Sequence, residues 1–242
     1  MNLLSLGTAQ RRLFAIHEAA APTSRRLRAV VLCHPWGAEY TYAHRSMRQL
    51  AMRLAMSGCH TLRFDYYGTG DSAGCEEDAD LAGCEADVET AVEALADIAG
   101  TRQVTLIGLR AGANIAAHVA VRKAAQVEAL VLWDPIASGA EYVQALQTAA
   151  AGTAADPPGG PMIRDIQSLQ LQSQVGLLPE HTAMLVTDSA QSWERLCQMG
   201  FAAGEKPVTI DFVATEPPWA EAATITGALP VAAFHRVVEW LR

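Results

Sequence analysis

The stretch that decides how this chain folds is "GLRAGA", residues 108–113. It follows the apolar run "VTLI" (104–107) and precedes "NIAAHVAVRKA" (114–124), which has the composition of a helix. A Gly-x-Ser-x-Gly motif between a strand and a helix places a nucleophilic serine on a sharply turned elbow. Gly108 and Gly112 supply both glycines, but the central position is Arg110. The sequence therefore predicts the backbone of such an elbow without its nucleophile.

Strand-like and helix-like segments alternate along the whole chain. Helical patterns follow several of the strands, notably at 43–58, around Val88 to Ala99, after Arg110 and at 230–242. This alternation predicts an α/β fold, a mostly parallel twisted sheet with helices on both faces, as a single domain over 1–242. The predicted strands are 12–19, 28–35, 60–68, 103–108, 128–135, 183–188 and 208–214.

One segment interrupts the alternation. About 48 residues separate Asp134 from the strand near Met184, more than an ordinary connection needs. They contain an Ala-rich helical piece and the helix-breaking stretch "DPPGGP" (156–161). Insertions in this architecture lie above the carboxyl ends of the strands, where ligands bind. We therefore expect a small lid over 136–182; the alternative is a surface excursion without structure.

The composition is that of a globular protein. Half of the 242 residues are hydrophobic and 18% are charged, and no apolar run is long enough to span a bilayer. The apolar start of the chain is too short for a signal peptide. Five cysteines, an odd number without a Cys-x-x-Cys pair, indicate reduced thiols in the cytoplasm and no structural zinc. We expect no cofactor and no metal.

The charges are unevenly distributed. Between Asp71 and Asp97 there are ten acidic residues and neither lysine nor arginine, whereas Arg45, Arg48 and Arg53 lie on one predicted helix. These are either solvated helix faces or, on the arginine side, a docking surface for an acidic carrier or enzyme partner. The net charge of −8 disfavours nucleic-acid binding.

Four motifs occur in an order typical of one superfamily. They are "VVLCHPWGAEY" (30–40), "LRFDYYGTGDSAG" (62–74), "VTLIGLRAGANIA" (104–116) and "LVLWDP" (130–135). Together they resemble the α/β-hydrolase superfamily, and more closely the serine-aminopeptidase-like hydrolases, including those associated with exosortase A systems. The resemblance covers about 28–135. It implies the α/β-hydrolase fold and a small-molecule ligand, acyl or anionic, in a biosynthetic setting.

The resemblance also implies where an oxyanion hole would lie. The loop 34–38, with Trp36 and Gly37, resembles the segment that supplies one backbone N–H. The second N–H would come from Ala111, the residue after the nucleophile position. Two such amides polarise a carbonyl and stabilise a tetrahedral anion.

The triad positions depart from the family's pattern. A guanidinium stays protonated and has no lone pair, so Arg110 cannot act as the nucleophile. The resemblance places the acid at Asp188, or alternatively at Asp134. The loop 214–223, where the family carries its histidine, contains none.

Two other histidines and three cysteines are weaker candidates. His235 lies within the last predicted helix, and His34 borders the pocket, either as a base or as a structural histidine bonded to backbone. Cys33 ends a buried strand, and Cys75 and Cys84 flank an acidic loop that would raise their pKa values.

Two functional hypotheses of different kinds follow. One is a hydrolase or acyltransferase with a non-standard catalytic set, and the other is a hydrolase-fold protein that binds without cleaving. Arg110 distinguishes them structurally: it either closes the pocket through a salt bridge to Asp134, or joins the oxyanion-hole amides to hold an anion or an acyl carbonyl.

Overall fold

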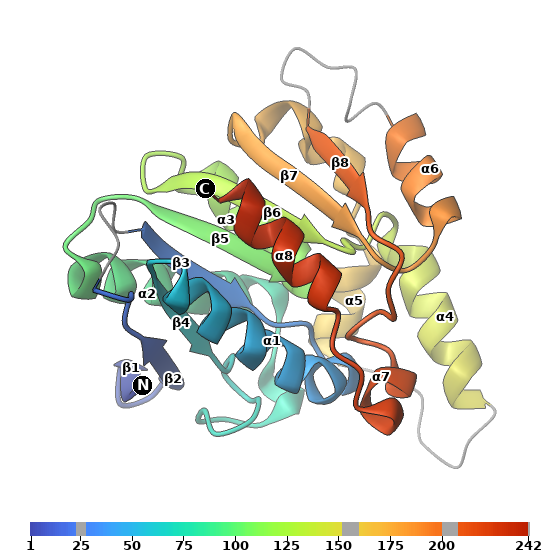
Figure 1. Cartoon of the computed structure of the whole chain (residues 1–242). Coiled ribbons are helices and arrows are strands. Elements are labelled where there is room, and N and C mark those ends of the chain that lie inside the picture. Colours follow the sequence, from blue (N-terminus) through green and yellow to red (C-terminus); the bar gives the residue numbers. More distant parts are fainter. Residues whose placement is uncertain (23–27, 152–159, 200–207, 242) are drawn as a thin grey trace.

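The computed structural model describes residues 1–22, 28–151, 160–199 and 208–241 (Figure 1). These residues form an eight-stranded sheet in the order β1-β2-β4-β3-β5-β6-β7-β8. The first two strands pair antiparallel, as do β2 and β4, and the remaining strands pair parallel. The strands are β1 Asn2–Gly7, β2 Arg12–Glu18, β3 Arg28–Cys33, β4 Cys59–Phe64, β5 Val104–Leu109, β6 Val127–Trp133, β7 His181–Val186 and β8 Thr209–Phe212.

Helices cover both faces of this sheet, which confirms the predicted fold class. The first and last helices pack with Leu32, Ile107 and Trp133 on one face, while α2 and α3 pack on the other face. No helix within the described ranges is long and apolar enough to cross a membrane. The helices are α1 Ala38–Met56, α2 Leu81–Ala99, α3 Ala111–Arg122, α4 Gly139–Ala151, α5 Pro161–Gln167, α6 Ala190–Gln198, α7 Glu221–Thr226 and α8 Val231–Trp240, with 3-10 turns η1 Glu76–Asp78 and η2 Leu171–Leu177.

Two elements differ from the sequence prediction. Strand β1 was not predicted; it is a short edge strand in which Leu4 and Leu6 pack against the core while Leu3 is exposed. Helix α1 begins at Ala38, well before the predicted start at 43, because Gly37 adopts a φ of 66° and turns the chain directly into the helix. The early start places Glu39 in the first helical turn, where a carboxylate is favoured by the helix dipole.

The segment 136–182 is folded against the domain wherever it is described. It contains α4, α5 and η2, and it buries Tyr142, Met162 and Ile166. In Figure 1, α4 and α5 lie on the side toward which the arrows of the parallel strands point. Most of "DPPGGP" lies in 152–159, outside the described residues. That this segment acts as a lid stays a prediction.

The elbow is packed so tightly that its glycines are required. A Cβ on Gly112 would lie 2.2 Å from the carbonyl oxygen of His34 and 2.4 Å from that of Cys33. A Cβ on Gly108 would lie 2.3 Å from the carbonyl oxygen of Gly112. The obstacles are backbone atoms that cannot rotate away. The loop after β3 therefore lies directly against the first turn of α3, as an oxyanion hole requires.

This packing gives a stability prediction for Gly112→Ala. The added methyl must displace the backbone of the loop after β3, so the variant should lose about 3 kcal/mol of unfolding free energy in urea denaturation. Gly176→Ala is the matched control, since a Cβ there meets no atom within 4 Å, and its stability should stay near wild type. Equal stability of both variants would show that the elbow is looser than described.

Candidate functional site

The elbow lies between the last residue of β5 and the first residue of α3. Arg110 is the N-cap of α3 with φ 55° and ψ −124°, and its N–H donates to the Trp133 carbonyl at 3.0 Å. Among the described residues, Arg110 and Asp134 (φ 43°) are the two non-glycine residues with a positive φ. Such strain persists only where the surrounding structure enforces it, and it is concentrated at functional sites. Both strained positions are triad positions of the resemblance.

The Arg110 side chain is held from four directions. Its Nε donates to Glu39 Oε1 at 3.1 Å, and its Nη1 donates to the backbone carbonyl of Asp134 at 3.3 Å. The guanidinium lies 4.0 Å from the ring centre of Trp219 and 5.2 Å from that of Tyr142. Only 15% of the side chain is exposed. The nucleophile position is thus filled by a paired and stacked cation.

The predicted salt bridge between Arg110 and the Asp134 carboxylate is wrong. The carboxylate that pairs with Arg110 belongs to Glu39. Asp134 offers Arg110 its backbone carbonyl, because its two carboxylate oxygens are already engaged by other donors.

Those donors surround the Asp134 carboxylate. Oδ1 accepts from the backbone N–H of Thr187 at 2.6 Å and from that of Asp188 at 3.3 Å. Oδ2 accepts from the Thr187 hydroxyl and from Nε1 of Trp219 at 2.9 Å. Burial raises the pKa of Asp134, and these hydrogen bonds oppose the shift. Of the two predicted acids, Asp134 is therefore the one that lies inside the site.

Trp219 comes from the part of the chain in which the sequence resemblance implied a catalytic histidine. It lies in the loop 214–223, its indole N–H donates to Asp134, and its ring faces Arg110. An imidazole at this place would use one nitrogen toward the acid and the other toward the nucleophile. Arg110, Trp219 and Asp134 thus form one contiguous network, joined by this ring contact and this hydrogen bond.

Sequence reasoning missed Glu39 and Trp219. Glu39 is buried, and burial raises the pKa of its carboxyl while the charge of Arg110 opposes that rise. Its Oε2 has no hydrogen-bond partner among the described residues. In the sequence, Glu39 could have been noticed as the acidic residue of the motif "HPWGAEY" (34–40). Trp219 could have been noticed as the tryptophan of the loop 214–223, which contains no histidine.

Among the described residues, His34 lacks the bond to backbone that its structural role predicted, and its role as a base stays a prediction. Its ring is 1% exposed, and neither nitrogen has a hydrogen-bond partner in the described ranges, so the expected bond to backbone is absent. Burial, with the charge of Arg63, lowers the pKa of His34 to about 3. The neutral ring instead lies beside Tyr40 and His44, with ring centres 5.4 and 6.2 Å away.

The side chains of Asp188 and His235 lie outside this network. The Asp188 carboxylate is exposed and accepts from Ser192 Oγ at 2.7 Å, and His235 is exposed on α8. Burial raises the pKa of the Cys33 and Cys84 thiols to about 12, which keeps both protonated. Trp36, which is buried, and Gly37 lie in the loop after β3, and their part in an oxyanion hole stays a prediction.

The sequence matches a known family over most of this site. The family model of serine aminopeptidase, S33, matches residues 24–159, more than half of the 242 residues. The chain belongs to the serine aminopeptidase S33 family. The matched region includes Glu39, Arg110 and Asp134, whereas Trp219 lies beyond it. No curated protein sequence matches the chain.

Solved structures confirm the α/β-hydrolase fold of this S33 family member. Est1E from Butyrivibrio proteoclasticus, solved with ferulic acid bound, superposes with a TM-score of 0.68 at 16% identity, covering 98% of this chain and 99% of its own. A hydrolase from Pseudomonas aeruginosa superposes with a TM-score of 0.68 at 17% identity, covering 99% of this chain and 98% of its own. Proline iminopeptidase from Mycobacterium smegmatis superposes with a TM-score of 0.68 at 12% identity, and the match covers 100% of both chains.

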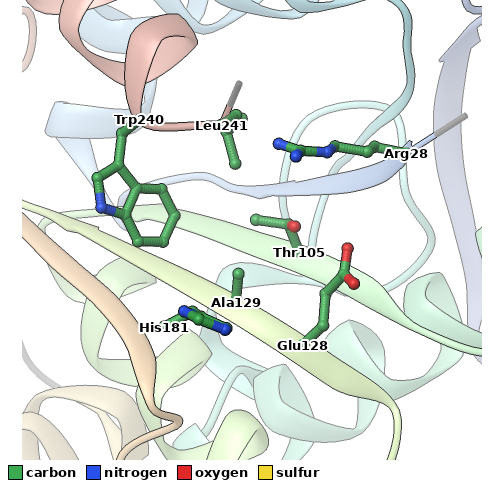
Figure 2. Close-up of a pocket in the computed structure, with 7 residues that line it drawn as sticks. All are labelled: Arg28, Thr105, Glu128, Ala129, His181, Trp240 and Leu241. Atoms are coloured by element: carbon green, nitrogen blue, oxygen red, sulfur yellow. The ribbon is translucent and has the colours of Figure 1, made fainter. Parts of the chain in front are cut away.

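A cavity of about 360 Å³ lies far from the elbow (Figure 2). It is found at the amino ends of β3, β5, β6 and β7 and beside the last turn of α8, whereas the elbow is at the carboxyl end of β5. It therefore does not belong to the site around Arg110. Its lining consists of Arg28, Thr105, Glu128, Ala129, His181, Trp240 and Leu241.

The Arg110–Glu39 pair should be strongly coupled. Arg110→Met leaves a buried carboxylate unpaired and should lower the unfolding free energy by about 3 kcal/mol. Adding Glu39→Gln removes that carboxylate, so the double variant should regain much of the loss in a double-mutant cycle.

The exposed pair Arg195–Glu141 is the matched control for this cycle. Its side chains are 50% and 58% exposed, so Arg195→Met should change the unfolding free energy by less than about 1 kcal/mol. Additive effects of Arg110→Met and Glu39→Gln would contradict the pairing at the elbow.

Proposed function

We propose that this S33 family member does not catalyse serine hydrolysis and instead binds the acyl group of a small molecule at the elbow. The observation that carries this proposal is the occupation of the triad positions by Arg110, Trp219 and Asp134, joined by stacking and one hydrogen bond. The elbow backbone and the adjoining loop after β3 keep the geometry of a catalytic scaffold.

The groups at these positions cannot perform the triad's proton transfers. A guanidinium is protonated at any pH at which the protein works, so Arg110 has no electron pair to attack a carbonyl. An indole N–H only donates, so Trp219 cannot accept the proton that a nucleophile must lose. The carboxylate of Asp134 therefore has no base to orient.

The charges at the site favour a neutral acyl carbonyl over a free anion. The positive charge of Arg110 is already matched by the adjacent Glu39 carboxylate, and the Asp134 carboxylate lies beside them. What remains for a ligand is the start of α3 at Ala111, because the N–H of Ala113 already donates to the Arg110 carbonyl at 2.9 Å. Backbone amides at a helix start bind a carbonyl oxygen without requiring a net charge.

The alternative is a hydrolase or acyltransferase in which the substrate brings its own nucleophile. The strained backbone of Arg110 and Asp134 favours it, since strain is retained where a site is still used. In that reaction the elbow amides would stabilise the tetrahedral anion. Substrate turnover without fluorophosphonate labelling of a serine would identify this alternative.

We also propose that an acidic carrier or enzyme partner docks on the arginine side of α1. Two of the three arginines on α1 serve the fold, because Arg45 donates to the Gly227 carbonyl at 3.0 Å and Arg53 lies 5.6 Å from the Phe234 ring centre. Arg48 is exposed and is the arginine of this helix that best fits a docking contact.

We expect negligible hydrolysis of short p-nitrophenyl esters and no labelling by a fluorophosphonate. Enzymes that lose triad residues keep a hydrolysis rate roughly 10³- to 10⁴-fold above the rate in water. This residual acceleration is the upper bound that we expect for the wild-type protein. Arg110→Ser alone should stay inactive, because an introduced serine would have no base beside it.

Combining Arg110→Ser with Trp219→His should restore measurable esterase activity and fluorophosphonate labelling. The introduced imidazole would inherit the hydrogen bond to Asp134 that Trp219 makes at 2.9 Å. The same pair with Asp134→Asn added is the control and should be inactive. Wild-type turnover that survives purification would refute the loss of hydrolysis.

A further inference from the structure

A second polar cavity opens beneath the first half of α1, on the side of β4 away from the central strands. Its volume is about 420 Å³, within the range of small-molecule pockets. The residues that hold the elbow together, Arg110, Glu39, Asp134 and Trp219, do not line it. The lining consists of Phe14, Ile16, Tyr40, His44, Arg63, Phe64, Asp65, Gly70 and Asp71.

The unusual member of this lining is Arg63. It lies on β4 opposite Ile16 of β2, and it is only 4% exposed. Its Nε has no hydrogen-bond partner, and within the described ranges no carboxylate lies at ion-pair distance from its guanidinium. A buried cation without a partner is unfavourable in an empty, dry site.

The two carboxylates whose charges act on Arg63 are engaged elsewhere: Glu18 pairs with the N-terminal amine at 3.4 Å, and Asp65 has two other donors. Asp65 Oδ1 accepts from the Tyr40 hydroxyl at 2.7 Å, and its Oδ2 accepts from the backbone N–H of Asp71 at 3.0 Å. Burial lowers the pKa of Arg63, and the nearby Glu18 and Asp65 charges do not offset it. The guanidinium therefore lacks a full counterion.

We propose that this cavity binds a small hydroxylated carboxylate or phosphate, whose anionic group pairs with Arg63. A guanidinium presents its donors in a fork that matches both anions. Asp71, exposed at the rim, is placed to accept a hydrogen bond from a ligand hydroxyl. The site is independent of the function proposed for the elbow.

The two histidines beside the cavity suit such a ligand. Burial lowers the pKa of His44, and the charge of Arg63 lowers it further, so the imidazole is neutral and can either donate or accept. Behind it lies His34, whose two buried nitrogens have no partner in the described ranges. The surroundings of Arg63 thus hold several polar atoms whose hydrogen-bonding capacity is unused.

Calorimetric titration with inorganic phosphate, acetate and glycolate tests the proposal. Wild type should bind phosphate saturably, and glycolate more tightly than acetate, since the two differ by one hydroxyl. Arg63→Met should weaken binding by at least about tenfold, the loss expected for one charged hydrogen bond. Arg102→Met is the matched control: it removes an exposed arginine before β5, and it should bind as wild type does.

Two further variants separate a ligand site from a structural role of Arg63. Without ligand, Arg63→Met should melt at or above the wild-type temperature, because it removes an unpaired buried charge. Ile16→Phe should fill the cavity and abolish binding while Arg63 is retained. The proposal is overturned by absence of saturable binding to wild type, by equal binding to wild type and Arg63→Met, or by a clearly lower melting temperature of Arg63→Met.

Discussion

A guanidinium at the elbow is the constraint on which the rest of the site depends. Arg110 lies at the junction of a central strand and a helix, with most of its side chain removed from water. Its charge must be matched there. Glu39 supplies the match, and it can do so because α1 begins immediately after Gly37. The same turn brings the loop after β3 against the first turn of α3.

The network joins Arg110, Trp219 and Asp134, which come from three separate parts of the chain. The Asp134 carboxylate receives the indole N–H of Trp219, which lies in the loop after β8. The Trp219 ring then covers the Arg110 guanidinium at 4.0 Å. Cation–π contact and the Glu39 pair hold this guanidinium, which has no lone pair with which to attack a carbonyl. Membership of the S33 family therefore accounts for the backbone fold, while the chemistry at the elbow depends on the side chains that this chain places there.

Much of this could be predicted from local sequence. The elbow glycines, the alternation of strands and helices and the place of Asp134 follow from short-range patterns, because strand ends and turns are encoded by neighbouring residues. Glu39 could not be found this way: its partner lies 71 positions away, and its helix starts at a glycine with positive φ rather than at a capping side chain. The contacts of Trp219, and the two His34 ring nitrogens that have no partner among the described residues, depend on tertiary packing, which periodicity does not report. The Arg110–Asp134 salt bridge failed for the same reason, since Thr187 and Trp219 engage that carboxylate first.

The hydrogen bond between Trp219 and Asp134 is the most direct measure of whether the network exists. In a proton–nitrogen correlation spectrum the five tryptophans give five indole signals, and Trp219→Phe identifies the one of interest. We predict that this indole proton exchanges slowly with water, and that its signal moves in Asp134→Asn and in Arg110→Met. An indole proton that exchanges as fast as a free tryptophan side chain, unmoved by either substitution, would contradict this prediction.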